Sequence, residues 1–506
     1  MGKQRKLSKS KLVAYRQCPK KVWLEVHHPE LGTISPATEA IFRTGHEVGI
    51  VAQRIYDPKG EGTEVDFKSD GVPAALNRTR ELLRGNGPIF EAGFAADRAL
   101  AFADVMLRTD DGGDKAGWRM VEVKSSTSVK PYQEDDAAIQ AHIAQASGVD
   151  LRGVAVAHID TTWIYPGGGD YDGLLVEKDL TASAFPRSEE VRSWIDEAQK
   201  IVAETEAPEI PIGPQCNTPF DCSFFGHCSA SLPVAEFPVN WLPGRKSKAL
   251  DTHIAETGTN DLRFLPDTLL NDQQRRVRDV TLSGTPYFDA AGAAGALASF
   301  PLPGYFLDFE TIQFGVPRWA GTHPYQMLPF QFSLHCLAAD GTVTHHGFLD
   351  LSGDDPSERF ANSLIEACRE ANPIFVYNAG FEGARLKELA QRFSNLAPEL
   401  LAIKDRLVDL LPITRKFFYH PAQKGSWSIK YVLPVVAPDL DYNALPGVHD
   451  GTQAMDAYLE AVDPSTSEAR KTEIRDALEQ YCALDTYAMI ALWRFLTGAT
   501  GTEGRP

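Results

Sequence analysis

The alternation of apolar and polar positions predicts a β-hairpin in the first third of the chain. Two apolar, β-prone runs at residues 103–106 and 120–124 flank a turn signal at residues 111–114. In the second run Glu122 and Lys124 are two positions apart, so both side chains lie on one face of the strand. We therefore expect one face of this hairpin to carry an acid and a lysine side by side.

Asp104, on the first of these strands, completes a pattern that fits metal-dependent chemistry. Carboxylates on two neighbouring strands can hold a divalent cation. A lysine beside them can orient an attacking water and stabilise charge that develops on a phosphate. The same three residues also fit an ordinary hairpin with a solvated Glu–Lys pair, so the surrounding residues decide between the two interpretations.

Further elements surround the hairpin in the sequence. Two predicted helices carry polar residues of interest, His46 and Gln140. Apolar periodicity and capping signals predict a short helix after Ser8 that ends at Cys18, a helix over residues 38–56, a strand over 88–94 and a helix over 135–146.

A strand of buried character at residues 305–311 begins a second region of regular structure. It carries Asp308 and Glu310 at positions i and i+2, hence on one face. Two carboxylates this close repel one another unless a metal ion or a proton neutralises them. The spacing therefore indicates a second candidate cation site.

The elements after this strand predict an α/β domain. Glu382 lies at the start of a helix that follows a strand, and a long helix over residues 472–496 carries Tyr481 and Asp485. These two residues are four positions apart and share a helix face. The remaining elements are expected as strands over 331–336, 342–348 and 373–378 and a helix over 357–369.

The composition is that of an ordinary globular protein, because 43% of the 506 residues are hydrophobic and 23% are charged. The length favours about three domains of roughly 150 residues each. The sequence has no run of 18 apolar residues and no signal segment at its start. We therefore expect a cytoplasmic protein without a membrane anchor.

The net charge of −18 argues against a protein that coats nucleic acid nonspecifically. It does not exclude a nuclease, because carboxylate-rich metal sites are themselves acidic and basic residues can be local. Eight lysines and arginines precede the first acid, Glu25. A solvated basic arm and a phosphate-contacting arm both fit this arrangement.

The seven cysteines argue against a disulfide framework, because their number is odd and the chain is expected to be cytoplasmic. Cys216, Cys222 and Cys228 lie close together in sequence. Thiolates grouped in this way suit an iron–sulfur cluster or a structural zinc ion. Three unligated cysteines in a loop are the remaining alternative.

The candidate residues of the first 230 positions occur in the order of a known family. They are, in chain order, Gly45–His46, Phe90–Glu91, Asp104, residues 121–126 (Val-Glu-Val-Lys-Ser-Ser) and Gln140. On these residues the segment resembles the RecB-like branch of the PD-(D/E)XK nucleases. Its relatives include the iron–sulfur exonucleases of CRISPR adaptation and the nuclease module of bacterial helicase–nucleases.

This resemblance implies a restriction-endonuclease-like fold and a role for each residue of the pattern. Lys124 would be catalytic, and Gln140 would help to place the substrate. The family's aromatic residue one turn after that glutamine is replaced here by Ala144. The implied ligands of Mg²⁺ or Mn²⁺ are His46, Asp104, Glu122 and the Val123 carbonyl.

The same resemblance gives the cysteines a role. In that branch one cysteine near the N-terminus joins three near the end of the domain to hold a [4Fe–4S] cluster. This implies that Cys18 acts with Cys216, Cys222 and Cys228, and that the cluster pins the two ends of the domain together. The gap of five residues between Cys216 and Cys222 is longer than the usual one. It keeps structural zinc open, with His227 as a substitute ligand.

The acids of the second region occur in the order of another family. The three motifs are Asp308-x-Glu310, Asn378-x-x-Phe381-Glu382 and Tyr481-x-x-x-Asp485. On these motifs the region resembles the DEDD (DnaQ-like) exonucleases of the RNase H-like superfamily, in their tyrosine variant. The resemblance implies an RNase H-like domain with a mixed sheet and flanking helices.

The resemblance also implies a two-metal site in this domain. Tyr481 would orient the attacking water, and Glu382 stands where the family has aspartate. Two Mg²⁺ or Mn²⁺ ions roughly 3.5–4 Å apart would support in-line attack on a phosphodiester. The implied metal ligands are Asp308, Glu310, Glu382 and Asp485.

Other polar residues of this region are candidates for substrate contact. Residues 324–331 and 418–430 resemble an uncharacterised bacterial domain that is often fused to RecB-like nucleases. His420 and Lys430 lie in the second of these stretches, and Asn378 belongs to the second DEDD motif. Structural roles are equally open for His420 and Lys430.

These observations predict two nuclease-type domains, at residues 1–230 and 301–498, separated by a linker with small helices at 231–300 and followed by a tail at 499–506. We expect Mg²⁺- or Mn²⁺-dependent cleavage of phosphodiesters. Single-stranded or end-containing DNA is favoured over RNA, in DNA repair or in defence against foreign nucleic acid such as phage DNA.

Other classes of function remain open. One is a module that binds nucleic-acid ends or assembles with partners and in which only one domain is catalytic. An RNA-processing exonuclease and a zinc-stabilised scaffold are the others. The helicase motif GxxxxGK[ST] is absent from the sequence, so a helicase partner would supply any unwinding.

Overall fold

The computed structural model describes residues 6–109, 117–230 and 232–499. The predicted turn at residues 111–114 lies outside the described residues, as does the tail from residue 500. None of the described helices combines the length and the apolar character that a membrane crossing needs.

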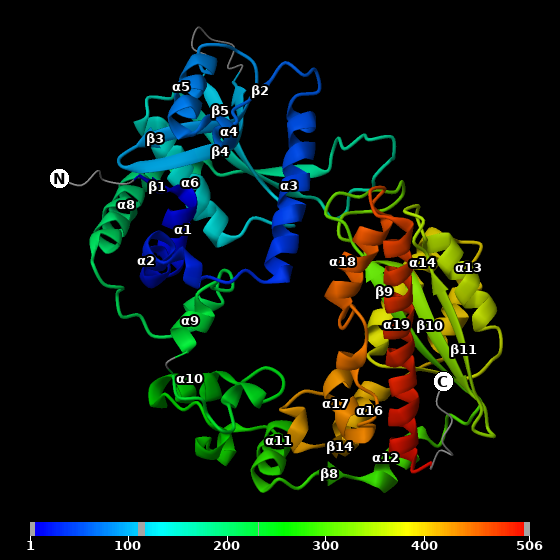
Figure 1. The fold of residues 1–506 in the computed structure, drawn as a ribbon. Helices are drawn as coiled ribbons and strands as arrows, with labels where there is room; N and C mark the ends of the chain where they lie inside the picture. The colour runs from blue at the N-terminus through cyan, green and yellow to red at the C-terminus, as the bar shows by residue number, and fades with distance from the viewer. Residues whose placement is uncertain (1–5, 110–116, 231, 500–506) are drawn as a thin grey trace. The chain divides into compact units, whose positions relative to one another are not determined.

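The chain divides into two compact units (Figure 1). Unit 1 comprises residues 1–232 and 314–326, and unit 2 comprises residues 233–313 and 327–506. Each unit combines helices with a mixed β-sheet, which confirms the predicted α/β class.

A seven-stranded sheet forms the centre of unit 1. Its strands are β1 (Leu7–Ser8), β2 (Thr63–Glu64), β3 (Ile89–Ala96), β4 (Ala99–Arg108), β5 (Trp118–Lys124), β6 (Leu151–Ile159) and β7 (Leu175–Asp179). The order is β2-β3-β4-β5-β6-β7, and β1 pairs in parallel with the start of β4. β3, β4 and β5 are antiparallel neighbours, which confirms the predicted hairpin, and β6 is parallel to β5.

Helices cover both faces of this sheet. They are α1 (Lys9–Gln17), α2 (Pro19–His27), α3 (Pro36–Tyr56), α4 (Phe67–Asp70), α5 (Val72–Leu82), α6 (Pro131–Ala146), α7 (Thr181–Ala184), α8 (Ser188–Ala203) and α9 (Phe225–Ser229). The Ser8 side chain caps α1, and Ser35 caps α3 before Pro36. Both caps fix where the predicted helices begin.

The two faces have different apolar residues. Met120 packs with residues of α6 and α8 on one face, whereas Val121 packs with Tyr56 of α3 on the other. Because side chains alternate along a strand, Glu122 and Lys124 share the face of Met120. The active-site candidates of β5 therefore lie toward α6.

Residues 314–326 belong to unit 1 although they follow a strand of unit 2; we call them the strap. Val316 is buried in an apolar cluster with residues of α3 and β6. The Tyr165 amide donates to the Thr322 carbonyl at 2.9 Å, and the Tyr325 hydroxyl donates to the Ser125 carbonyl. The sequence analysis assigned these residues to the second domain, and the structure corrects that assignment.

A five-stranded mixed sheet forms the centre of unit 2, in the order β11-β10-β9-β12-β13. Its strands are β9 (Gly304–Ile312), β10 (Leu328–Leu337), β11 (Val343–Leu349), β12 (Ile374–Val376) and β13 (Leu407–Asp409), and β8 (Tyr287–Phe288) pairs separately with β14 (Phe418–Tyr419). β9, β10 and β11 are antiparallel, whereas β12 and β13 run parallel to β9.

Helices pack on both faces of this sheet as well (Figure 1). They include α13 (Ser357–Ala367), α14 (Ala379–Arg392), α15 (Ala397–Asp405), α16 (Leu410–Phe417), α17 (Ile429–Val436), α18 (Gly451–Val462) and α19 (Glu468–Thr497). Leu307 and Phe309 of β9 pack with α13 and α14, whereas Phe306 packs with α19. Asp308 and Glu310 alternate with Leu307 and Phe309, so they face α19.

The segment from residue 233 to 300 is part of unit 2 rather than a separate linker. Its helices are α10 (Lys248–Thr257), α11 (Asp272–Ser283) and α12 (Ala290–Leu297). Leu250 and Leu262 lie in a small apolar core of this segment. Val277 of α11 packs with Tyr419, and α12 packs against α16 and α19. The short helices were predicted correctly. The prediction of a linker was wrong, because the segment packs into unit 2 through these buried contacts.

Candidate active sites

The hairpin of unit 1 brings Asp104 and Glu122 onto neighbouring strands. The Asp104 Oδ2 atom accepts a hydrogen bond of 2.6 Å from the Val123 amide. Glu122 is buried, and its Oε2 atom accepts a hydrogen bond of 2.5 Å from Gln140 Nε2 on α6. The structure therefore brings together these four residues of the sequence pattern.

Two lysines and two carboxylates form a closed ring of alternating charges beside the hairpin; we call it the charge ring. Lys124 Nζ lies 2.6 Å from Glu122 Oε1 and 2.8 Å from Asp136 Oδ2. Lys9 Nζ lies 2.7 Å from the same Glu122 oxygen and 3.5 Å from Asp136 Oδ1. Each ammonium group thus bridges the same two carboxylates.

Sequence reasoning missed Lys9 and Asp136 as members of this site. Asp136 precedes Gln140 by four residues on α6, so the shared helix face was a usable signal. Lys9 is the first residue of α1 and follows the two-residue strand β1. Only the pairing of Leu7 and Ser8 with β4 brings it to the site, and so short a strand has no recognisable pattern.

The electrostatics of this site separate its two acids. Burial and the charge of Glu122 raise the pKa of Asp104 to about 8. Burial opposes ionisation of Glu122 too, but Lys124 and Lys9 outweigh it and hold its pKa well below the usual range. Burial disfavours the charged form of Lys124, yet the surrounding carboxylates raise its pKa well above the ordinary value. At neutral pH Asp104 therefore holds a proton that a divalent cation would displace.

Two other residues of the family pattern lie near the hairpin. Glu91 stands opposite Asp104 in the register of β3 and β4, with φ at 55°. A non-glycine residue in this region is strained, and such residues cluster at functional sites. His46 is exposed on α3, which packs against β4 and β5. Among the described residues, no hydrogen bond or ion pair joins His46 to Asp104 or Glu122, and its role as a metal ligand stays a prediction.

The four cysteines of the predicted cluster line one pocket of unit 1 with Phe224. Burial raises the pKa of the Cys222 and Cys228 thiols. Among the described residues, no three of these four sulfur atoms lie within 4.8 Å of one another. The pocket brings together four thiols, a ligand set that suits either an iron–sulfur cluster or a zinc ion.

Hydrogen bonds join the two segments that supply these cysteines. Gln17 Nε2, next to Cys18, donates to the Gln215 carbonyl at 2.9 Å and to the Phe220 carbonyl at 2.6 Å. Gln17 is itself buried. The polypeptide thus already brings the N-terminal cysteine to the three distal ones, as the sequence analysis expected.

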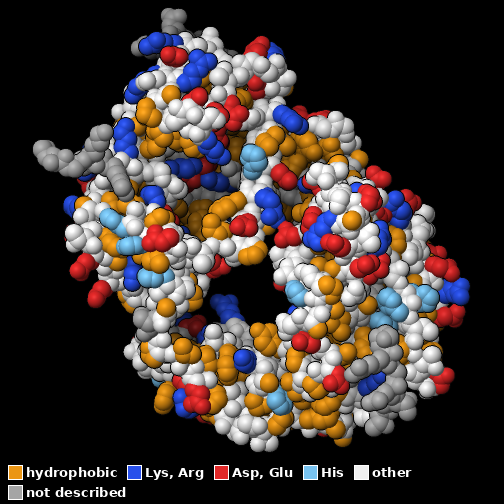
Figure 2. Space-filling view, in the orientation of Figure 1, with side chains coloured by type: hydrophobic (Ala, Val, Ile, Leu, Met, Phe, Trp, Pro, Cys, Tyr) orange, Lys and Arg blue, Asp and Glu red, His pale blue; other side chains and the backbone are white. Residues whose placement is uncertain are grey.

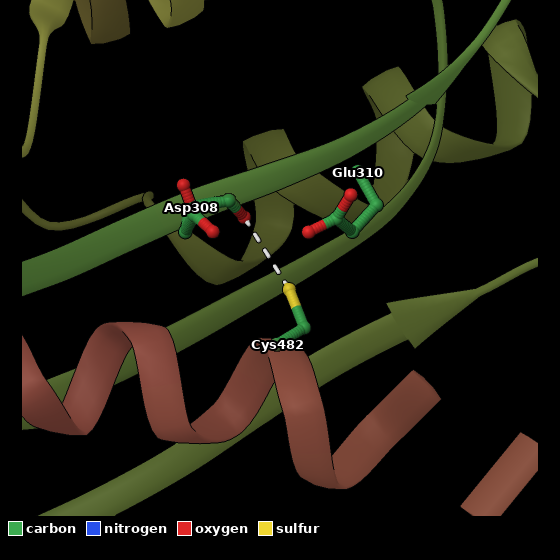
Figure 3. A group of neighbouring side chains, drawn as sticks. All are labelled: Asp308, Glu310 and Cys482. Atoms are coloured by element: carbon green, nitrogen blue, oxygen red, sulfur yellow. Dashed lines mark hydrogen bonds between the residues drawn. The ribbon is translucent and has the colours of Figure 1, made fainter. Parts of the chain in front are cut away.

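The carboxylates of unit 2 come from three separate elements. Asp308 and Glu310 lie on β9, facing α19 (Figure 3), and a carboxylate oxygen of each lies within 4.8 Å of the Cys482 sulfur. Asp485 comes from α19 and Glu382 from the first turn of α14. Asp485, Glu310 and Glu382 all contribute to the electrostatic field at Asp308. The structure therefore brings the four predicted acids together.

Their protonation reflects this crowding. Burial and then the charges of Asp485, Glu310 and Glu382 raise the pKa of Asp308 well above its ordinary value. Burial and the charge of Asp485 raise the pKa of Glu310 to about 8, and burial raises that of Glu382 to about 8. Burial also raises the pKa of Asp485 to about 6. The four acids are thus a cluster whose full ionisation requires positive charge.

Tyr442 and Lys430 complete the surroundings of Asp485. The Tyr442 hydroxyl donates a 2.5 Å hydrogen bond to Asp485 Oδ1. Tyr481 lies one turn before Asp485 on α19 and shares its helix face. Lys430 Nζ lies 5.2 Å from the centre of the Tyr481 ring and 5.5 Å from that of Tyr442, and donates to the His449 carbonyl at 2.6 Å. Sequence reasoning found Tyr481 and Lys430 but missed Tyr442, because the segment that carries it has no motif spacing relative to Asp485.

Two of the predicted substrate contacts have other surroundings. Asn378 precedes α14 and is exposed, with φ at 85°. Its backbone N–H donates to the Asp409 side chain. His420 Nδ1 accepts a hydrogen bond of 3.1 Å from the Ala422 amide, so its ring caps a short turn. The structure gives His420 this capping contact and places Lys430, not His420, beside the acids.

Charged side chains of both signs are interspersed over the face drawn in Figure 2. Such a surface agrees with the net charge of −18, which disfavours nonspecific coating of nucleic acid. Positive charge near the candidate carboxylates comes from individual lysines, namely Lys9, Lys124 and Lys430.

Comparisons with known proteins place this chain only broadly. Residues 305–428 match the family described as "Domain of unknown function (DUF2779)". No curated protein matches the chain. The solved structure described as "Crystal structure of SSO0001" is 14% identical in sequence, covers 46% of this chain and 90% of its own, and superposes with a TM-score of 0.25.

Proposed function

We propose that this protein is a metal-dependent nuclease with one hydrolytic site in each unit, and that its substrate is single-stranded or end-containing DNA. The observation that carries the proposal is the convergence of Asp308, Glu310, Glu382 and Asp485 from β9, α14 and α19 into one buried acidic cluster. Burial raises the pKa of all four acids, and the charges of the other three raise that of Asp308 further, as expected where carboxylates share a site for divalent cations.

The residues present fit Mg²⁺ or Mn²⁺, which prefer oxygen ligands. Among the described residues, Glu382 Oε2 is a buried oxygen without a hydrogen-bond partner. Such an atom is costly unless something binds it. Ions held by Asp308, Glu310, Glu382 and Asp485 would supply activation of water and neutralisation of phosphate charge.

The protein's own groups in unit 2 would orient the reactants. Tyr442 donates to Asp485, which fixes that carboxylate, and Tyr481 would orient the attacking water from the same face of α19. Burial raises the pKa values of Glu310 and Asp485, and the positive charge of Lys430 partly offsets that rise. An ammonium group at this position can also bind a phosphate of the substrate.

In unit 1 the same chemistry would use a different set of groups. Asp104 and Glu122 would hold the ion, and Lys124 would bind the phosphate under attack, with Gln140 holding Glu122 in place. Asp136 keeps Lys124 charged and directed toward Glu122. A lysine beside two carboxylates is what stabilisation of a pentavalent phosphate requires.

We further infer a [4Fe–4S] cluster at Cys18, Cys216, Cys222 and Cys228. The pocket that these four cysteines share supports it. The cluster would be structural, because it joins the start of unit 1 to its end. The strand arrangements also support a PD-(D/E)XK-like fold for unit 1 and an RNase H-like fold for unit 2.

Cleavage of end-labelled oligonucleotides tests the proposal. Single- and double-stranded DNA and RNA are incubated with Mn²⁺ and wild-type protein, Lys124→Ala, Asp308→Ala or the double variant. We expect each single variant to lose a distinct set of products and the double variant to be inactive. If Asp308→Ala changes nothing while Lys124→Ala abolishes all cleavage, unit 2 binds nucleic acid without cutting it. Absence of cleavage by the wild type under any metal would refute the proposal.

A further inference from the structure

The charge ring contains one lysine that the proposed chemistry uses and one that it does not. Lys124 and Lys9 both contact Glu122 Oε1, at 2.6 and 2.7 Å. We propose that Lys9 is a second substrate-contacting residue of this site and binds a backbone phosphate of the nucleic acid next to the one that Lys124 binds. This inference rests on the proposed function of unit 1.

The two ammonium groups contact the same two carboxylates, but Lys9 lies farther from Asp136, at 3.5 Å, than Lys124 does, at 2.8 Å. They contact opposite oxygens of Asp136, Oδ2 for Lys124 and Oδ1 for Lys9. The Lys9 side chain is 21% exposed and that of Lys124 is 24% exposed, whereas Glu122 and Asp136 are 2% and 6% exposed. The lysines are thus the members of the ring that solvent reaches. The access that lets Lys124 meet a phosphate is equally available to Lys9.

Glu122 has more partners than its charge requires. Its Oε1 atom receives two ammonium groups, and its Oε2 atom receives the Gln140 amide. One lysine would suffice to neutralise this carboxylate. A cation bound by Glu122 would compete with both ammonium groups for the same oxygen, and Lys9 would keep Asp136 as its partner while facing solvent.

The backbone that carries Lys9 is held firmly. Leu7 is buried and pairs with Ala99 of β4, and the Ser8 hydroxyl accepts from the Lys11 amide to begin α1. Lys9 is therefore presented by a fixed strand–helix junction rather than by a mobile arm. A positively charged group on a rigid support loses little entropy when it binds a phosphate.

A purely structural role is the competing explanation, in which Lys9 only neutralises buried carboxylates. Phosphate contact has a signature that neutralisation lacks. Each phosphate contact on single-stranded DNA releases counterions and contributes about −0.7 to the slope of log K against log salt concentration. Loss of one contact therefore reduces the steepness of the salt dependence, whereas loss of internal charge balance changes thermal stability without changing that slope.

The experiment is a salt titration of DNA binding by the full chain. The dissociation constant for a fluorescein-labelled single-stranded oligonucleotide is measured in the presence of Ca²⁺ at a series of salt concentrations. A gel verifies that the oligonucleotide is not cleaved during the measurement. Wild type, Lys9→Ala and Lys9→Arg are compared with Lys11→Ala as the matched control. Lys11 lies on the same helix, is 32% exposed and pairs with Glu25, away from the ring. The Asp308→Ala background in all variants removes cleavage by unit 2.

We expect Lys9→Ala to weaken binding several-fold and to reduce the slope by about 0.7, and Lys9→Arg to restore the slope. In steady-state cleavage with Mn²⁺, Lys9→Ala should raise KM more than it lowers kcat. A slope and a Kd for Lys9→Ala equal to those of Lys11→Ala, in a folded protein, would overturn the inference and leave the proposed function intact. If Lys9→Ala does not fold, Lys9→Arg against Lys9→Gln gives the same test. Failure of the wild type to bind or cut DNA would instead refute the proposed function.

Discussion

Lys124 contacts one carboxylate of its own strand, Glu122, and one of helix α6, Asp136. Asp136 lies 2.8 Å from its ammonium group and keeps the pKa of Lys124 high. Asp135 is adjacent in sequence but pairs with Arg16 at 3.2 Å and with Arg187 at 2.6 Å. The two neighbouring acids therefore have separate tasks, one at the site and one between helices.

We predict that Asp136→Asn lowers kcat of the Lys124-dependent cleavage by about 10–100-fold, the usual cost of removing a group that orients a ligand or catalyst. The same change in Asp135, Asp135→Asn, should leave kcat within about twofold. Rates are measured on end-labelled DNA with Asp308→Ala in both variants. Equal losses in the two variants would mean that only folding of α6 is affected.

The acidic cluster of unit 2 makes a second prediction about single residues, on pH. Glu310 has an ordinary pKa of 4.5 that burial and Asp485 raise to about 8 in the folded protein. The folded state then binds this proton more tightly than the unfolded state does. Its contribution to stability is complete below pH 4.5 and is lost as the pH rises to 8.

In a chelating buffer the melting temperature of unit 2 should therefore fall between pH 5 and pH 8. Glu310→Gln should flatten this fall and melt higher than wild type at pH 8 by several degrees, since about 1 kcal/mol corresponds to about 2–4 °C for a unit of this size. Glu256→Gln, at an exposed position of α10, is the control. Calorimetry from pH 5 to 8 measures the effect, and parallel pH profiles for wild type and Glu310→Gln would contradict it.

At the scale of elements, local sequence signals predicted the site strands well. Residues 120–124 and 305–311 are apolar, β-prone runs that carry acids, and they lie in the strands β5 and β9. The expected proximity of Glu122 to Lys124 and of Asp308 to Glu310 followed from the two-residue period alone. Motifs of this kind involve residues close together in the chain, so they can be identified from a single sequence.

The missed members of the sites lie on elements that tertiary structure, not local pattern, brings there. Lys9 depends on a two-residue strand, and Tyr442 lies in a short turn before α18. His46 was expected at the metal from the family resemblance, and its ring is exposed on α3. The position of a residue along a helix determines the helix face on which it lies. It does not determine which other element packs against that face.

The cysteine pocket joins α2 to the segment before α9, and it gives a prediction for these elements. Anaerobically purified protein should absorb near 400 nm, contain about four iron atoms per chain and little zinc. Cys216→Ser should lose the absorbance and lower the melting temperature of unit 1, whereas Cys368→Ser, a buried cysteine of unit 2, should keep the absorbance. One zinc per chain without visible absorbance would instead establish a zinc site.

At the scale of the whole molecule, one segment belongs to unit 1 although its neighbours in sequence on both sides belong to unit 2. The strap, residues 314–326, follows β9, which carries Asp308 and Glu310, yet it belongs to unit 1. Its Val316 completes an apolar cluster with Val48 of α3, and Tyr325 donates to the Ser125 carbonyl, one residue after Lys124. A boundary drawn from the sequence alone would separate unit 1 from a part of its own core.

This arrangement predicts that damage to the strap affects the unit 1 site. Val316 is 7% exposed, so Val316→Asp places an unpaired charge in the apolar cluster and should lower the melting temperature of unit 1 by about 5–10 °C. Cleavage that depends on Lys124 should fall with it, while cleavage that depends on Asp308 should persist. Val234→Asp, at a position that is 93% exposed, is the matched control. A strap that packed only with unit 2 would leave the Lys124 site unaffected. Loss of the Asp308-dependent products alone would therefore contradict the assignment of the strap to unit 1.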